Sequence, residues 1–160
     1  MPAMTTLGVV HTAFALVALV CASIALIKYK EISPQNGSGS LYIVTTAVTA
    51  LTSLGIYQHG GFGFQHILGI LTIAGLAIGL LAARTKLFGS SSRTVQAIGF
   101  STTILFHLLP GVTEMLTRFP PGNPIVASYS EPTLKIALLL VLVSFIVGLA
   151  LQLRWLRSTK

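Results

Sequence analysis

The segment Ile136-Ala-Leu-Leu-Leu-Val-Leu-Val-Ser-Phe-Ile-Val-Gly-Leu-Ala-Leu151 contains no charged side chain. It belongs to an apolar run over 134–154, and a helix needs about 20 such residues to cross the hydrocarbon core of a bilayer. Four further runs of this kind precede it, at 5–27, 41–58, 64–83 and 94–113. The sequence therefore predicts an all-α integral membrane protein, in which residues 1–160 form a single bundle of five transmembrane helices.

The composition agrees with a membrane protein. Hydrophobic residues make up 53% of the 160-residue chain and charged residues 8%, whereas soluble domains carry roughly 25% charged residues. A chain this short has too little interior to hide so many apolar side chains from water. A soluble enzyme and a nucleic-acid-binding domain are therefore excluded, even though the net charge is +7. The lone Cys21 lies inside an apolar run and is expected to be a small core residue.

The basic residues are distributed unevenly between the two sides of the predicted bundle. Lys and Arg are retained on the cytoplasmic side of a membrane, and an N-terminus outside the cell places most of them inside. The inner segments then hold Lys28, Lys30, Arg84, Lys86, Arg93, Arg154, Arg157 and Lys160, and the outer segments hold Arg118 and Lys135. We therefore expect the N-terminus outside and the C-terminus in the cytoplasm. The expected interfacial aromatic anchors are Tyr29, Tyr42 and Trp155 inside, and Tyr57 and Tyr129 outside.

The connections between the runs have loop compositions. Residues 28–40, 59–63 and 84–93 are rich in Gly, Ser or Pro, which favour turns. The longest connection, 114–133, contains Arg118-Phe-Pro-Pro-Gly-Asn-Pro124, and prolines at this density prevent a regular helix through its middle. We expect it to form an ordered or semi-ordered cap on one membrane face.

All four histidines fall on the outer side once this orientation is adopted. His11 lies about two turns, or roughly 9 Å, into the first run, and His107 lies at a similar depth in the fourth. His59 closes the second run and His66 opens the third. Intramembrane ionisable residues usually mark functional sites, so these histidines are the candidate site of the protein.

Helical spacing places further polar residues on the face of His107. Gln96, Thr103, His107 and Glu114 share one face of the fourth run, and polar side chains facing lipid would cost several kcal/mol each. That face must therefore point into the bundle. Other faces carry small residues or threonines: His11, Ala15, Ala18, Ala22 and Ala25 in the first run, Thr45, Thr49 and Thr52 in the second, and Gly75, Gly79 and Ala83 in the third. The small residues permit close helix packing.

Three chemistries fit a histidine cluster of this kind. Any two of His11, His66 and His107 meet the depth requirement for axial ligation of a haem b. Three nitrogens from His11, His59, His66 and His107 would bind copper or zinc and leave a position open. The cluster could also bind a quinone carbonyl, with Glu114 and His59 passing protons to water. Gln65 and Thr103 are candidate hydrogen-bond partners.

The structural alternatives to a cofactor site are plain hydrogen bonding or snorkelling by the histidines and an ion pair between Glu114 and Arg118, four residues apart, that stabilises the outer end of the fourth helix. The leading hypothesis is a redox protein that ligates haem or a transition metal. The alternative is a non-catalytic subunit or assembly partner of a larger membrane complex, or a homo-oligomer. The sequence assigns no reaction, so enzymatic activity stays undecided.

Several short motifs resemble one bacterial family. They are Gly8-Val-Val-His11, Ser40-Leu-Tyr42-Ile, Leu51-Thr-Ser-Leu-Gly55-Ile and Gly61-Phe-Gly-Phe-Gln-His66-Ile-Leu. Over residues 7–84 their order resembles a small multi-pass membrane family known as domain of unknown function 2306. Members usually carry a His-Arg-containing inner loop where this chain has Pro34-Gln-Asn-Gly-Ser-Gly. The resemblance implies a bacterial plasma-membrane location with matching histidines at His11 and His66, and it implies no activity.

Overall fold

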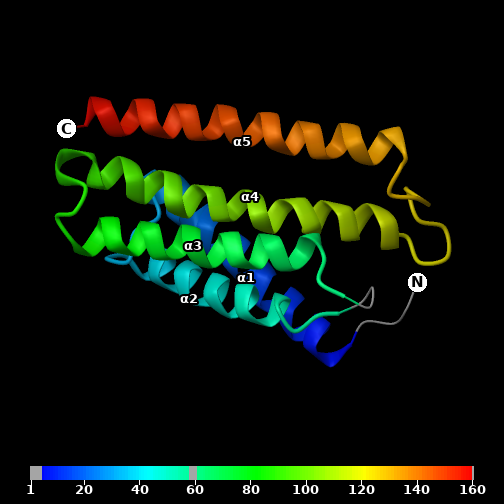
Figure 1. The fold of residues 1–160 in the computed structure, drawn as a ribbon. Coiled ribbons are helices and arrows are strands. Elements are labelled where there is room, and N and C mark those ends of the chain that lie inside the picture. Colours follow the sequence, from blue (N-terminus) through cyan, green and yellow to red (C-terminus); the bar gives the residue numbers. More distant parts are fainter. Residues whose placement is uncertain (1–4, 58–60, 160) are drawn as a thin grey trace.

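The computed structural model describes residues 5–57 and 61–159, which form five α-helices and one short 3-10 helix (Figure 1). The elements are α1 (Thr6–Tyr29), α2 (Gly37–Ser53), α3 (Phe64–Arg84), η1 (Gly89–Ser91), α4 (Ser92–Arg118) and α5 (Pro132–Ser158). The all-α prediction is confirmed. Four helical segments are long and apolar enough to cross a membrane: Thr6–Tyr29, Phe64–Arg84, Gly89–Arg118 and Pro132–Ser158.

Successive helices run in alternating directions (Figure 1). The main packed pairs are α1 with α2, α2 with α3, α3 with α4, and α4 with α5. The ends of α1, α3 and α5 and the starts of α2 and α4 gather at one end of the bundle, which we call the basic end. It carries Lys28, Lys30, Arg84, Lys86, Arg93, Arg154 and Arg157, and Lys160 lies outside the described residues. We call the opposite end the histidine end.

The second helix differs from the predicted run over 41–58. Helix α2 begins at Gly37, because the Asn36 side chain accepts a hydrogen bond from the backbone N–H of Gly39 at 2.7 Å and so caps the first turn. It ends at Ser53 and contains 17 residues, a length of about 26 Å. Residues 37–40, expected in a loop, are therefore helical, and residues 54–57 are not.

The core near the basic end depends on small residues. Ala18, Ala22 and Ala25 of α1 are fully or almost fully buried, which confirms the small-residue face expected for the first run. Cys21 is buried beside them, also as expected. In α3, Gly75 and Gly79 pack against Gly99 of α4, where an added Cβ would lie 3.0 Å from backbone atoms of both glycines. These small-residue faces hold the helices of this chain together.

The fourth helix is longer than predicted, because it continues through Pro110 to Arg118. Residues 114–118, expected in the loop, belong to its last turns. The chain beyond them folds back on the helix: the backbone N–H of Val126 donates to the carbonyl oxygen of Leu116 at 3.0 Å, and Val126 is fully buried. The Glu131 carboxylate accepts from the backbone N–H groups of Ala127 and Ser128. The expected ordered cap is thus present.

The basic end is fastened by side chains of α4. Arg93 forms a two-pronged ion pair with Glu31, with nitrogen–oxygen distances of 3.0 and 3.1 Å, a geometry that suits the planar guanidinium. One turn further along, the Gln96 amide donates to the carbonyl oxygen of Ile32 at 2.8 Å, and both residues are buried. These contacts tie the start of α4 to the loop between α1 and α2.

We expect Gly99→Ala to destabilise the protein, because the added methyl group meets the backbone of α3 and must push the two helices apart. The cost should be about 1–3 kcal/mol, as for other overpacked sites, measured as the free energy of unfolding in detergent. Gly111→Ala is the matched control in the same helix, since a Cβ there meets no atom within 4 Å. Equal stability of the two variants would contradict the close α3–α4 contact.

Candidate functional site

His11 of α1 is held by the C-terminal part of α2. Its Nδ1 atom lies 3.0 Å from the carbonyl oxygen of Thr49 and 3.1 Å from the hydroxyl oxygen of Thr52. A carbonyl oxygen only accepts hydrogen bonds, so Nδ1 carries the proton and donates it. In the neutral ring, Nε2 then carries a lone pair, and the described residues make no hydrogen bond to it. The imidazole is therefore oriented, with one nitrogen left for a ligand.

His107 of α4 contacts the same helix one turn closer to the basic end. Its Nε2 lies 3.2 Å from the hydroxyl oxygen of Thr46, and the His107 side chain and Thr46 are both buried. The Tyr42 ring meets the His107 ring edge-on, with 6.4 Å between ring centroids. Thr49 and Thr46, the α2 residues that bond to His11 and His107, lie three residues apart. One face of α2 therefore brings the two histidines together.

A buried hydroxyl pair continues this polar face towards the basic end. The Tyr42 hydroxyl lies 2.5 Å from the hydroxyl of Thr103 and donates to the carbonyl oxygen of Phe100 at 3.3 Å. Tyr42 and Thr103 are both fully buried. The prediction that Tyr42 is an interfacial anchor is therefore wrong: its hydroxyl finds a protein partner on α4 and its ring fills the core. Tyr29, Tyr57 and Tyr129 are exposed.

The polar face predicted for the fourth helix points into the bundle as expected. Gln96, Thr103 and His107 are buried, whereas Glu114 is half exposed at the histidine end and forms an ion pair with Arg118. This pairing was expected from the four-residue spacing. Glu114 is thus an acidic group with access to solvent on the helix that carries His107.

His66 occupies a different place, in the first turn of α3. Its Nδ1 accepts a hydrogen bond from the backbone N–H of Gly63 at 2.9 Å, and its ring lies between the rings of Phe62 and Tyr57, with centroid distances of 5.0 and 4.7 Å. The Nε2 atom is buried and has no hydrogen-bond partner within residues 5–57 and 61–159. Gln65 lies with its amide beside Gly63.

The described histidines thus divide into a pair and a single residue. His11 and His107 share the α2 face, whereas His66 is held by residues that precede it in the chain. Within the described part of the chain, no group of three His, Cys, Asp or Glu side chains lies close enough to hold a metal ion. His59, a candidate for such a group, lies outside the described residues.

Thr46 was not foreseen as a partner of His107. The sequence favours Thr45, Thr49 and Thr52 because they follow helical spacing, yet the Thr45 hydroxyl bonds only to carbonyls of its own helix. The sequence does show that α2 is rich in Ser and Thr, and not all of these hydroxyl groups can face lipid. Which of them meets a histidine depends on the rotation of α2 about its axis.

Comparisons of the chain with protein-family models, with curated proteins and with solved structures give no match.

Proposed function

We propose that this protein is a membrane redox protein in which His11 and His107 would hold a haem b. The observation that carries the proposal is the hydrogen bond from His11 Nδ1 to the Thr49 carbonyl oxygen. Ligating histidines usually donate their second ring N–H to a carbonyl or carboxylate, which fixes the tautomer and points the other nitrogen at the metal. His11 has this arrangement already, on a residue that is half-buried.

The number of donors favours haem over a bare copper or zinc ion. A haem iron takes its four equatorial nitrogens from the porphyrin and needs only two side chains, and α2 brings two imidazoles together. Structural and catalytic zinc sites need three or four protein ligands. Haem b would supply reversible one-electron transfer when bound. The residues of this chain hold the rings: Thr49 and Thr52 orient His11, and Thr46 and Tyr42 position His107.

A quinone is the proposed electron partner. Quinone reduction consumes protons as well as electrons, and Glu114 is a half-exposed carboxylate on the helix that carries His107. In this proposal all five helices sit in a bacterial plasma membrane, with α2 shielded by its neighbours, the N-terminus outside and the basic end in the cytoplasm. The excess of Lys and Arg at the basic end supports this orientation.

The second candidate function is that of a subunit in a larger membrane complex. Helix α5 supports it, because no residue of its apolar window is buried in the bundle. A partner protein would cover part of this surface. Mass measurement of the protein extracted in a mild detergent would detect a stable stoichiometric partner, whereas a monomer or homo-oligomer of this chain would count against the candidate.

The haem proposal predicts an absorption spectrum with a Soret band that sharpens and shifts when a reductant is added. His11→Ala and His107→Ala should each abolish this band while the protein still inserts and purifies. His66→Ala is the matched control, because His66 lies apart from the pair and should leave the band in place. A featureless spectrum of the native protein, or haem retained in both His11→Ala and His107→Ala, would contradict the proposal.

The histidine pair also predicts a stability difference between two neighbouring threonines. Thr46→Val removes the hydroxyl that meets His107, and we expect the free energy of unfolding to fall by about 0.6 kcal/mol, the average for hydrogen bonds between membrane helices, and by at most about 1.7 kcal/mol. Thr45→Val is the control, since it is equally buried but bonds only within α2. Denaturant titration in detergent measures both. A larger loss of unfolding free energy in Thr45→Val than in Thr46→Val would contradict the assignment of the interhelical hydrogen bond to Thr46.

A further inference from the structure

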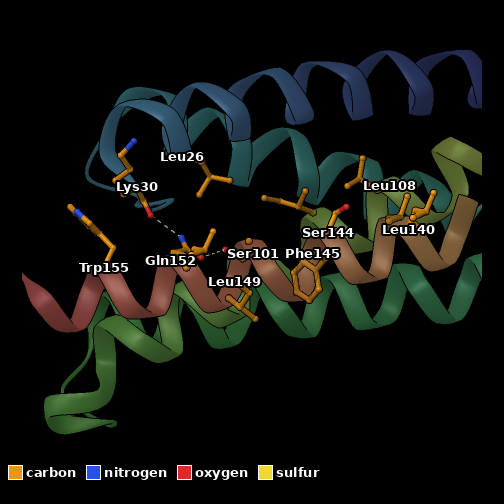
Figure 2. A pocket seen from close by; sticks show the side chains of 14 residues that line it. Leu26, Lys30, Ser101, Leu108, Leu140, Ser144, Phe145, Leu149, Gln152 and Trp155 are labelled. Atoms are coloured by element: carbon orange, nitrogen blue, oxygen red, sulfur yellow. Dashed lines mark hydrogen bonds between the residues drawn. The ribbon is translucent and has the colours of Figure 1, made fainter.

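A groove of about 610 Å³ runs between α1, α4 and α5, a volume within the range of roughly 300–1,000 Å³ of ligand sites. Figure 2 shows its course, from Lys30 and Trp155 at the basic end to Leu108 and Leu140 at the other. Its walls are almost wholly apolar and include Leu26, Phe145 and Leu149. From Trp155 to Leu140 the groove follows α5 for about 22 Å. This elongated, apolar shape suits a hydrocarbon chain.

Hydrogen bonds of Gln152 cross the groove near its basic end, and we call this crossed part its closed end. The Gln152 amide donates to the carbonyl oxygen of Lys30 at 3.0 Å, and the Ser101 hydroxyl donates to the Gln152 amide oxygen at 2.7 Å. Gln152 thus joins α5 to both α1 and α4 (Figure 2). A packed helix needs about 8–10 Å between helix axes, so a transmembrane helix of a second copy cannot run the full length of a groove that is closed in this way. A single acyl chain is thin enough to do so.

The charges at the closed end suit a phosphate group. Lys30 lines the groove, and its ammonium group bonds only to the carbonyl oxygen of Ile27 within the described residues. Arg154 and Arg157 are exposed on the last turns of α5 at the same end. The chain contains three acidic residues, of which only Glu31 lies there, and it is paired with Arg93. The closed end therefore carries unpaired positive charge next to an interfacial tryptophan.

We propose that this groove is a binding site for an anionic phospholipid. One acyl chain lies along α4 and α5, and the phosphate lies at the closed end beside Lys30 and Trp155. This site is separate from the histidine pair, and the proposal does not depend on the proposed redox function. Anionic lipids are attracted to basic residues at the membrane surface, and the apolar groove adds a fixed place for the chain.

The single tryptophan of the chain provides the readout. The protein is reconstituted in vesicles of equal parts phosphatidylglycerol and phosphatidylcholine, with bromine atoms on the acyl chains of one lipid or the other. Brominated phosphatidylglycerol should quench Trp155 fluorescence several times more strongly than brominated phosphatidylcholine. Lys30→Gln should reduce this preference by about fivefold, the effect of one surface charge. Lys86→Gln, a basic-end residue outside the groove lining, should not change it.

A second pair of variants tests the groove itself. Gly148 lines the groove, and an added Cβ there meets no atom within 4 Å, so Gly148→Leu fills the groove without forcing the helices apart. It should lower the quenching by both brominated lipids, whereas Val147→Leu on the exposed face of α5 should leave it unchanged. Equal quenching by the two lipids, unchanged in Lys30→Gln and Gly148→Leu, would overturn the proposal. A detergent-stable dimer that Gly148→Leu converts to a monomer would overturn it in favour of a second copy.

Discussion

The absence of water in the hydrocarbon core is the constraint on which this structure depends, because every polar side chain there must find a partner in the protein. Helix α2 meets this demand for His11, His107 and Thr103. Tyr42, Thr46 and Thr52 offer side-chain oxygens to neighbouring helices, and Thr49 offers its backbone carbonyl. A short helix rich in hydroxyl residues, packed between α1 and α3, therefore decides where the imidazoles of α1 and α4 come to lie.

The two ends of the bundle are held by different forces. At the basic end, Arg93–Glu31 and the amides of Gln96 and Gln152 tie together α1, α4 and α5, and small residues let the helices approach closely. Towards the histidine end, His11 and His107 join α1 and α4 to α2 by hydrogen bonds. A ligand that replaced one of these bonds would disturb α1 and α4 locally and leave the fastened end in place.

The sequence predicts well how deep in the membrane a residue lies on its helix. It predicts poorly in which direction the side chain points around the helix axis. Apolar runs located all five helices, and helical spacing placed Gln96, Thr103 and His107 on one buried face of α4. The same reasoning put His66 with His11, because both lie near one membrane face. Hydropathy does not record the direction in which a side chain leaves its helix, and His66 points to Phe62 and Tyr57. The start of α2 was missed because one Asn36 cap outweighs a loop-like composition.

The rotation of α2 about its axis also explains why Tyr42 is buried, although the sequence predicted it at the membrane interface. An aromatic residue near the end of an apolar run usually anchors at the interface, yet the face of α2 that holds Thr46 and Thr49 also turns Tyr42 inward, against Thr103. The same face of α2 bonds to both His11 and His107. These hydrogen bonds stabilise the bundle, and under the proposed function they would also orient the two histidines as ligands.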